Sequence, residues 1–382
     1  MLSNKVNKQY KHFSKRYAKQ NIDIFRLYDW DIPEIGVVVD WYAGHLVVAE
    51  YLKKNSDPYW LTVMAEAVAK TLDVKIENLH IKQRHTGYKD GNRYERIAHT
   101  DKKIVMSERD LKFYINLEDY VDTGLFSDHR NTRVMVREMA QGKDFLNLYC
   151  YTGSFSCYAA KGEAKRTVSV DRSESAIQWA KENMELNEIP VDSGFTVREN
   201  INDKNAIDSK VGIDNKEIQK EASSQKNIFI KAHAFDFLEK AKKKGQMFDI
   251  AVVDPPSFSS SRESNTRQCQ SGSTSPNFKR EDLDITRKEI DLKHHFDIAQ
   301  DHPQLLKAVV EVMRKDSGSV IFFSTNHQNF QLKLDELDVV KSSLEESCDS
   351  FIKEIKEITS ITIPEDYKTP KKQIHRCWKI VV

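Results

Sequence analysis

The sequence has few cysteines and no long hydrophobic run. Five of its 382 residues are cysteine, and no two of them form a Cys-x-x-Cys pair. This spacing suits neither a disulfide framework nor a zinc cluster, and it is typical of a reducing cytoplasm. No stretch of about 18 apolar residues could span a membrane, and no apolar segment follows the first charges as in a secretory signal. We therefore expect a cytoplasmic protein that binds no membrane, and nothing in the sequence suggests a metal.

Acidic residues are absent from the first twenty positions, although the whole chain has a net charge of only +1. The basic residues of this segment are Lys5, Lys8, Lys11, Lys15, Arg16 and Lys19. Apolar residues recur at steps of three and four between Val6 and Tyr17, which predicts a basic amphipathic helix over residues 1–20. The side chains expected to contact RNA phosphates are Lys8, Lys11, Lys15 and Arg16. An ordinary solvated helix face and a membrane-surface helix are the alternatives.

Residues 21–120 combine short apolar or β-branched runs with one helical pattern. Strands are predicted at residues 24–27, 37–42, 46–51, 79–83, 104–107 and 111–116, and a helix at residues 58–71. Together these elements predict a small α+β domain, and we expect this domain to bind RNA.

From residue 121 to residue 382 strands alternate with helices, the pattern of a parallel sheet covered on both faces. Strands are predicted at residues 145–149, 167–170, 228–232, 248–253 and 320–323, and helices at 154–161, 173–186 and 305–313. Residues 358–363 and 374–381 are predicted to pair as a terminal antiparallel hairpin. The polar segments 202–226 and 261–290 are interpreted as surface insertions.

The first candidate binding element is the segment FLNLYCYTGSFS, residues 145–156. A strand that opens into a loop of small residues and then a helix leaves N–H groups at the carboxyl edge of the sheet, where ligands bind. Gly153 would let a ligand approach the backbone closely. A single glycine is neither a dinucleotide fingerprint nor a phosphate loop, so a simple tight turn stays open as the alternative.

Two acidic residues follow later strands. Asp171 closes the predicted strand 167–170, where a carboxylate can accept hydrogen bonds from ribose hydroxyls. Asp236 follows the strand 228–232 and could accept from an adenine amino group. Either residue could instead cap the next helix.

The most specific pattern is FDIAVVDPPSF, residues 248–258. Two prolines fix the backbone and remove two N–H donors, so Asp254 and the carbonyl of Pro255 are held at the sheet edge. A planar base could be gripped there, with Phe258 stacked on it. A purely structural turn is the alternative.

These elements, in this order, resemble class I S-adenosylmethionine-dependent methyltransferases. More narrowly, the chain resembles the guanine-N7-methylating half of the bifunctional bacterial 23S rRNA methyltransferase. The segments that carry the resemblance are RLYDWDIPEIGVVVDWYAGHLVVAEY (26–51), VDTGLFSDHRNTR (121–133), FLNLYCYTGSFSCYAAKGEAK (145–165), SVDRS (169–173), DPPSFSSS (254–261), FFSTN (322–326) and IHRCWKI (374–380). The family's partner half is missing here, and the two polar insertions are longer than expected.

The resemblance implies an α/β fold of the Rossmann-like class. Its sheet would be mostly parallel and seven-stranded, with a terminal antiparallel hairpin, and a small α+β domain would precede it. The cofactor would be S-adenosylmethionine. The residues expected to bind it are Asp128, Arg130, Asn147, Tyr149, Tyr151, Thr152, Gly153, Ser154, Asp171, Arg172, Ser173, Asp236, Phe237 and Asp254. The residues expected to face the target base are Asp254, Pro255, Pro256, Ser257 and Phe258. Arg130 could pair with the methionine carboxylate, or it could form an ion pair at the domain junction.

The guanine-N7 target implied by the resemblance is consistent with a missing thiol. Methylation of cytosine at C5 requires a cysteine nucleophile. In related cytosine enzymes this cysteine comes just after the fifth strand. Residues 323–326 read Phe-Ser-Thr-Asn here, and we expect Cys377 to be packed. Guanine N7 already carries a lone pair and needs only alignment with the methyl donor. Adenine N6 remains possible, because the Asp-Pro-Pro motif could accept from an amine. It ranks second because the resemblance over the whole chain is to the guanine-N7 enzyme.

The expected function is therefore methylation of guanine N7 in large-subunit ribosomal RNA, naked or in a precursor particle. Since A-form helices hide this edge of the base, the guanine would have to be exposed or flipped. The alternatives are a non-catalytic ribosome-assembly factor on a methyltransferase scaffold, and a DNA or protein methyltransferase. A separate partner methyltransferase could supply the missing half.

Overall fold

The computed structural model describes residues 1–52, 57–85, 96–192, 226–260, 295–315, 318–327, 329–333, 351–369 and 373–382. Both predicted polar insertions, 202–226 and 261–290, lie almost wholly outside these ranges. None of the helices in the described part of the chain is long and apolar enough to cross a membrane.

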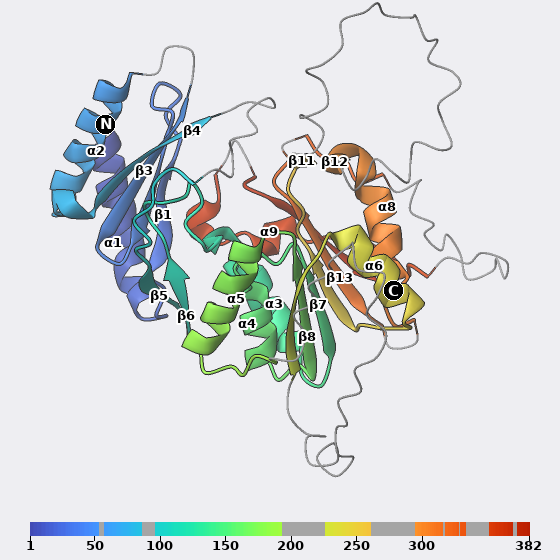
Figure 1. The fold of residues 1–382 in the computed structure, drawn as a ribbon. Coiled ribbons are helices and arrows are strands. Elements are labelled where there is room, and N and C mark those ends of the chain that lie inside the picture. The colour runs from blue at the N-terminus through green and yellow to red at the C-terminus, as the bar shows by residue number, and fades with distance from the viewer. Residues whose placement is uncertain are drawn as a thin grey trace, which may run out of the picture.

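The N-terminal unit is a four-stranded sheet with two helices on one face (Figure 1). Its elements are α1 (Leu2–Ala18), β1 (Ile24–Asp29), β2 (Val37–Tyr42), β3 (His45–Leu52), α2 (Pro58–Thr71), η1 (Ile76–Asn78) and β4 (Leu79–His85). The strands lie in the order β1-β2-β3-β4, and only β3 and β4 are parallel because α2 connects them. The apolar stripe of α1, from Val6 to Tyr17, packs into the core beneath the sheet.

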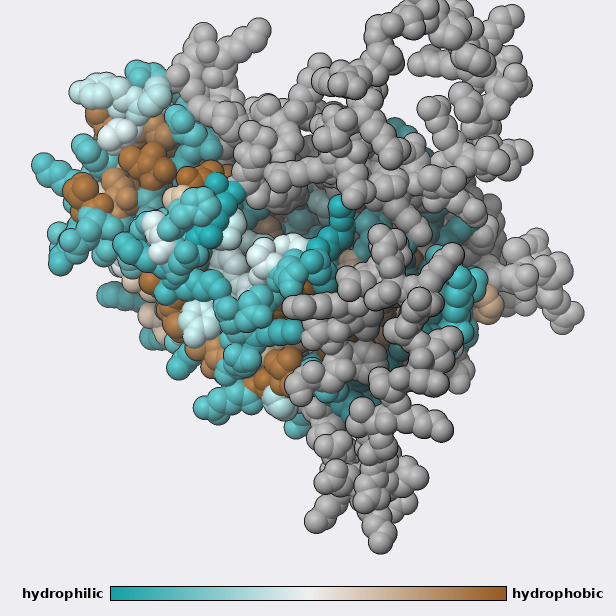
Figure 2. Space-filling view, in the orientation of Figure 1, coloured by the Kyte–Doolittle hydropathy of each residue, from teal (hydrophilic) through white to brown (hydrophobic). Residues whose placement is uncertain are grey.

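A hairpin and a linker lead from this sheet to the next. The hairpin consists of β5 (Ile104–Glu108) and β6 (Leu111–Ile115), and the linker ends in η2 (Ser127–His129) and α3 (Arg130–Met139). Figure 2 shows a group of hydrophobic residues over the N-terminal unit and smaller groups lower on the molecule, set among hydrophilic residues.

The second sheet has seven strands in the order β14-β15-β13-β10-β7-β8-β9. These strands are β7 (Asp144–Leu148), β8 (Arg166–Asp171), β9 (Lys226–Lys231), β10 (Ile250–Val253), β13 (Val320–Thr325), β14 (Glu354–Glu357) and β15 (Arg376–Val381). All neighbouring pairs from β9 to β13 are parallel, whereas β15 runs antiparallel to both β13 and β14. The predicted Rossmann-like α/β fold is thereby confirmed.

Helices cover both faces of the seven-stranded sheet (Figure 1). One face carries α3, α4 (Ser154–Lys161) and α5 (Glu174–Leu186), and the other carries α6 (Ala234–Lys243) and α8 (Ile298–Val310). A short ladder of β11 (Phe258–Ser260) and β12 (His295–Asp297) lies beside the end of β10. The strands between the helical layers are almost continuously buried, as expected for a parallel sheet.

The predicted strand at residues 358–363 is wrong. Thr359–Thr362 forms the short helix α9, and the strand that pairs with β15 is β14, just before it. The reason is the position of β14 at the sheet edge, where its sequence Glu-Ile-Lys-Glu remains largely exposed. The apolar pattern of the sequence therefore points to Ile358 and Ile363. Both are buried, but they lie after β14 and not within it.

Candidate active site

The carboxyl ends of the parallel strands lie level along one edge of the seven-stranded sheet. Val253 of β10 is in register with Leu148 of β7 and with Phe323 of β13. Tyr149 and Asp254, which follow directly, therefore emerge at the same edge. The direction of the chain connections reverses between β7 and β10, and open parallel sheets bind ligands at such a point.

The loop after β7 has an unusual backbone. Tyr149, Tyr151 and Gly153 have positive φ angles of 57°, 48° and 73°. Residues with a Cβ rarely adopt this left-handed conformation, and such outliers cluster at ligand sites. The N–H of Tyr151 donates to a carboxylate oxygen of Asp171 at 3.0 Å, which ties the loop to the end of β8. Ser154, half-buried, then begins α4.

The structure gives a second reason for a glycine at position 153. A Cβ atom there would lie 2.8 Å from the Cβ of Ala180 on α5. Such a distance requires neighbouring atoms to move. Gly153 therefore serves the packing of the loop on α5 as well as the left-handed turn that begins α4.

Asp171, the last residue of β8, is held by backbone N–H groups. Its carboxylate accepts from the N–H of Tyr151 at 3.0 Å and from that of Ser173 at 2.9 Å. Burial raises the pKa of Asp171, and these backbone hydrogen bonds oppose the increase. Ser173 caps α5 as predicted, since its hydroxyl accepts from the N–H of Ala176. Arg172 and Ser173 are exposed at this edge.

Two residues predicted to bind the cofactor support the loop from inside. The side-chain amide of Asn147 donates to the hydroxyl of Ser156 at 2.9 Å, and that hydroxyl lies 2.7 Å from the hydroxyl of Ser169. Thr152 donates to the carbonyl of Gly124 at 2.6 Å. Because these groups are buried and satisfied, the side chains of Asn147 and Thr152 position the loop and α4 rather than face a ligand.

Two aromatic residues follow β9, and the one predicted to bind adenine, Phe237, is the more deeply buried of the two. Asp236 lies half-buried in the first turn of α6. Phe237 is only 5% exposed, and its ring packs in the core 6.4 Å from that of Phe248. A contact of the Phe237 ring with adenine is therefore excluded. Phe235 is half-buried and lies 6.4 Å from the ring of Phe296, which is also 6.4 Å from Tyr149.

Asp254 follows β10 and is held by the neighbouring strand. Its carboxylate accepts from the hydroxyl of Ser324 at 2.7 Å, and Pro255 behind it is buried. The backbone of Phe258 begins β11, but its side chain lies outside the described part of the structure. This loop therefore presents a fixed carboxylate at the edge of the sheet.

A second contact holds the same loop. The hydroxyl of Ser257 donates to the side-chain oxygen of Asn326 at 2.5 Å. Pro256 and Ser257 are half-buried, whereas Asn326 is exposed. The loop after β10 and the end of β13 thus form one continuous wall.

A buried cluster of one aspartate and two histidines lies against Asp254. The ring of His375 contacts the carboxylate of Asp128 at 2.9 Å through Nδ1, and it stacks on the ring of His129 with 4.1 Å between centroids. His129 in turn lies 3.7 Å from the carboxylate of Asp254. Burial opposes ionisation of Asp128, yet His129 and His375 hold the pKa of its carboxyl well below the ordinary value. The cluster connects the linker, the C-terminal strand and the Asp-Pro-Pro loop.

The same three residues, Asp128, His129 and His375, are the group among the described residues whose ligand atoms, all within 4.8 Å, could hold a metal. A bound zinc needs lone pairs that converge on one point about 2 Å away. The two rings are nearly parallel, with 12° between their planes, so their in-plane lone pairs do not converge. The geometry favours a structural role instead, in which His375 is hydrogen-bonded to Asp128 and the stacked ring of His129 lies against Asp254.

The chain is similar to known proteins over most of its length. Residues 32–235 match the family of S-adenosylmethionine-dependent methyltransferases. The chain belongs to this family. Ribosomal RNA large subunit methyltransferase K of Neisseria meningitidis is 32% identical over 383 residues, with 99% of this chain and 86% of that protein covered.

Longer relatives are also similar. Ribosomal RNA large subunit methyltransferase K/L of Vibrio cholerae is 30% identical over 383 residues, covering 99% of this chain and 43% of that protein. The methyltransferase chain thus spans less than half the length of this K/L relative. Among solved structures, a methyltransferase crystallised with SAH has a TM-score of 0.62 at 17% identity, covering 100% of this chain and 82% of that one. An S-adenosylmethionine-dependent methyltransferase from Streptococcus mutans has a TM-score of 0.62 at 16% identity, covering 100% and 81%. At these identities the structural likeness shows the fold alone.

S-adenosylmethionine is the cofactor of the methyltransferase, and the edge described above fits it. A ribose needs acceptors, which the carboxylate of Asp171 provides. Adenine needs apolar neighbours, and the half-buried rings of Phe235 and Tyr149 each lie 6.4 Å from the ring of Phe296. When bound, the cofactor supplies an electrophilic methyl group. The assignment of each residue to a part of the cofactor remains a prediction.

Arg130 of the methyltransferase lies at the junction between the sheets. Its guanidinium donates to both oxygens of Asp366, at 3.2 and 3.1 Å, and to the carbonyl of Ile24 at 2.8 Å. The hydroxyl of Tyr17 donates to the same aspartate at 2.8 Å. The structure therefore shows the alternative stated for Arg130, an ion pair at the junction, in place of a contact with the methionine carboxylate.

The basic helix α1 of the methyltransferase exposes part of its charge. Lys8, Lys11 and Lys15 are exposed, and within the described residues no ion pair engages them. Arg16 differs, because it pairs with Glu365 at 2.8 Å. The helix is as predicted, while its contact with RNA remains a prediction.

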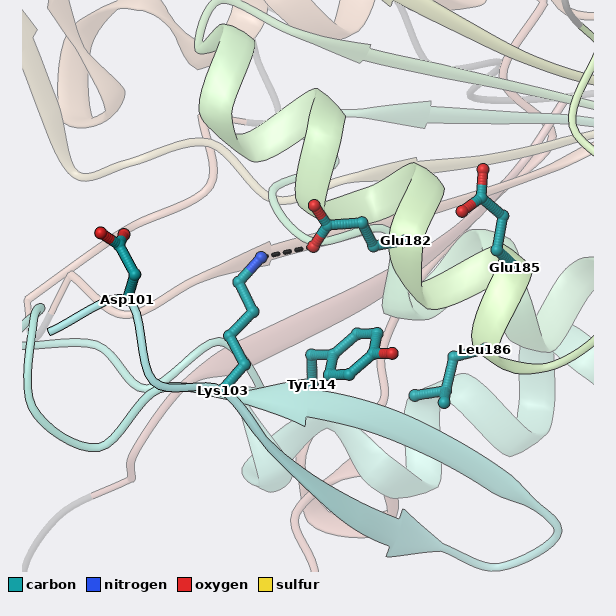
Figure 3. A pocket seen from close by; sticks show the side chains of 6 residues that line it. All are labelled: Asp101, Lys103, Tyr114, Glu182, Glu185 and Leu186. Carbon is teal, nitrogen blue, oxygen red and sulfur yellow. Dashed lines mark hydrogen bonds and ion pairs between the residues drawn. The ribbon is translucent and has the colours of Figure 1, made fainter.

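A hollow of about 530 Å³ lies elsewhere on the methyltransferase, between β6 and the C-terminal half of α5 (Figure 3). Lys103 pairs with Glu182 across it, beside Tyr114. Because a helix rises 1.5 Å per residue, Glu185 in its wall lies about 18 Å along α5 from Ser173. We assign this hollow no part in the chemistry.

Proposed function

We propose that this methyltransferase transfers the methyl group of S-adenosylmethionine to N7 of a guanine in large-subunit ribosomal RNA. The relatives named for ribosomal RNA of the large subunit support the substrate class. A cytoplasmic location follows from that substrate, and a partner methyltransferase remains an expectation. The observation that supports the atom is the absence of an accessible thiol near Asp254 in the described structure.

Cys377 lies beside this wall, since it pairs in register with Ser324, which contacts Asp254. It is fully buried, and burial raises its pKa, with Asp254 adding to the increase. A neutral, inaccessible thiol cannot attack C6 of cytosine. This favours a base atom that carries its own lone pair.

Asp254 has two roles in the proposed reaction. Its carboxylate accepts from the N1–H and exocyclic amine of guanine, which orients the base with N7 toward the methyl donor. Methylation of N7 leaves a positive charge on the base, and a fixed carboxylate nearby stabilises the developing charge. Ser324 and Ser257 contribute by holding this wall in place. No proton has to be removed from N7.

The test is methyl transfer from labelled S-adenosylmethionine to large-subunit rRNA that lacks its modifications. Wild type and Asp254→Asn are compared, since the amide keeps the shape and loses the charge. The RNA is then assayed for chain cleavage at N7-methylguanine. Label in the wild type with cleavage at one guanine is expected, with at least a hundredfold lower rate for Asp254→Asn.

Other outcomes point elsewhere. Label without cleavage would exclude N7 and favour adenine N6 or a carbon atom. Tight cofactor binding without label on naked RNA or precursor particles would favour another substrate. Absence of cofactor binding would favour a non-catalytic assembly factor.

A further inference from the structure

A small cavity lies where four separate segments of the chain meet. The end of α1, the turn between β5 and β6, the start of α3 and residues 364–365 enclose about 250 Å³. Three of the side chains in its wall are arginines: Arg16, Arg109 and Arg130. Its lining shares no residue with the loops after β7, β8 and β10 that form the cofactor edge.

Two of these arginines have N–H groups without a partner. Arg130 is 1% exposed, and its terminal nitrogens are engaged by Asp366 and the carbonyl of Ile24, but its Nε has no acceptor among the described residues. The Nε of Arg109 is likewise buried and unpartnered within the described structure, and no ion pair engages Arg109 there. A buried N–H without an acceptor is destabilising by about 1–3 kcal/mol, so an acceptor that reached either Nε would stabilise the folded protein.

The charges in the wall favour an anion. Glu365 is the acidic residue that lines the cavity, and it contacts Arg16 at 2.8 Å and His12 at 3.1 Å. Behind the wall Asp366 pairs with Arg130, so Arg109 is the guanidinium of the three that no described carboxylate pairs with. Guanidinium N–H groups match the oxygens of phosphate in geometry and charge.

The size and position of the cavity favour a phosphate group of a polymer. Sites for drug-sized ligands occupy roughly 300–1,000 Å³, so 250 Å³ suits a phosphate better than a whole nucleotide. The exposed Lys15 and Lys19 precede and follow Arg16 and Tyr17 on α1, which extends the positive surface from the cavity along the helix.

We propose that Arg16, Arg109 and Arg130 form a pocket that binds one backbone phosphate of the RNA substrate. The proposal rests on RNA as the substrate class but not on which base atom is methylated. The pocket would fix the N-terminal unit on the RNA while the Asp254 wall receives the target base. A free phosphate could use the same chemistry, and the test separates the two sources.

Arg109 is the residue to change, because its backbone permits a clean substitution. It has a φ of 63°, and its N–H donates to the carbonyl of Asn21 at 2.8 Å in the β5–β6 turn. Asparagine and aspartate tolerate this left-handed conformation better than most residues. Arg109→Asn therefore removes the charge with little effect on the turn, and Arg109→Asp reverses it.

The experiment measures the affinity of the full chain for a transcript of large-subunit rRNA over a range of NaCl concentrations. For Arg109→Asn we expect affinity to fall about 5- to 20-fold at low salt. The slope of log K against log salt should become shallower by about one phosphate contact. Arg109→Asp should lose more, and Arg109→Lys should retain the wild-type slope. The matched control is Lys244→Gln, an exposed lysine just after α6.

Four results would overturn the proposal. An unchanged affinity and slope for Arg109→Asn would do so directly. A loss for Arg109→Lys as large as that for Arg109→Asn would assign the effect to the turn instead of the charge. A loss as large for Lys244→Gln would show general charge attraction without a pocket. Binding of inorganic phosphate that is abolished by Arg109→Asn, with RNA affinity unchanged, would assign the pocket to a free anion. RNA binding is measured without methyl transfer. These four results can therefore be interpreted even if the methylated atom is not guanine N7.

Discussion

The Nε2 atom of His129 lies 3.7 Å from a carboxylate oxygen of Asp254 and 3.7 Å from one of Asp128. Burial lowers the pKa of His129, and the stacked ring of His375 adds to the decrease. The ring of His129 lies between the two carboxylates. Its place behind the Asp-Pro-Pro loop makes it a positioning residue for Asp254.

Replacing His129 should slow methyl transfer while cofactor binding persists. His129→Ala removes the ring that packs between Asp254 and Asp128, and a displacement of about 1 Å at a reacting group can lower rates about a hundredfold. We expect kcat to fall about 10- to 100-fold and the affinity for S-adenosylmethionine to change less than about threefold. The measurement is steady-state methyl transfer with separate cofactor titration. His99→Ala, at an exposed histidine, is the control. An equal fall in cofactor affinity would place His129 in the cofactor site instead.

Replacing Asp171 should weaken cofactor binding. Asp171→Ala removes the carboxylate that accepts from the Tyr151 and Ser173 N–H groups and, by proposal, from ribose. Hydrogen bonds to a charged group contribute about 1.5–3 kcal/mol each, so the dissociation constant for S-adenosylmethionine should rise at least about tenfold. Isothermal titration calorimetry would measure the dissociation constant. Glu174→Gln, three residues further along the chain, is the control. An unchanged dissociation constant would remove Asp171 from the site.

Gly153→Ala should destabilise the fold more than Gly142→Ala. Both glycines have similar positive φ angles, 73° and 69°, so both substitutions carry the same backbone penalty. Only the new methyl at position 153 meets another atom, the Cβ of Ala180 at 2.8 Å, while position 142 has none within 4 Å. We expect Gly153→Ala to lower the free energy of unfolding by about 1–3 kcal/mol more, measured by urea denaturation. Equal losses would show that the loop yields to the methyl group.

The pair of Arg130 and Asp366 should be important for stability. Both side chains are almost fully buried, at 2% and 0% exposure, so removal of one partner leaves an uncompensated charge. Arg130→Ala should lower the free energy of unfolding by about 3–5 kcal/mol. The exposed pair of Lys243 and Glu239 is the control, and Lys243→Ala should change it by less than about 1 kcal/mol. Similar values for both pairs would contradict a structural role at the junction.

Acidic pH should destabilise the protein through His80. Burial lowers the pKa of His80 to about 4, and His45, whose Nδ1 lies 3.2 Å away, adds to the decrease. Between pH 6.5 and 4 the unfolded chain therefore binds more protons at this site than the folded one, so stability falls as the pH falls. His80 is partly exposed, and after allowance for solvent screening the loss is about 1–2 kcal/mol. His80→Gln should reduce the difference between unfolding free energies at pH 7 and pH 4.5, and an unchanged difference would assign the pH dependence to other groups.

The periodicity of the sequence predicted most of the elements. The helix at 58–71 has the predicted bounds, with Asp57 accepting from the N–H of Tyr59 at its start. The helix at 154–161 also has the predicted bounds. These elements carry their own local signals in capping residues and apolar spacing, so a single sequence suffices to find them.

The directions of side chains were harder to predict. Phe235 and Phe237 both follow β9, and only the packing of α6 against the sheet decides that Phe237 faces the core. Arg130 and Asp366 are 236 residues apart, so no local pattern announces their contact. His375 belongs to the motif IHRCWKI, but its contact with Asp128 depends on the position of β15 in the sheet. These features are tertiary and leave no signature in local periodicity.

The position of β15 also governs the order in which the molecule can assemble. This strand lies between β13 and β14, and it comes from residues 376–381, after every other strand of both sheets. The N-terminal sheet is complete once β4 has been made, so on the ribosome it can fold early. The seven-stranded sheet must wait, because β14 has no neighbour until β15 arrives between it and β13. His375 arrives at the same moment, so the support of Asp254 is assembled last, and a nascent chain can hold a folded N-terminal unit before it can methylate.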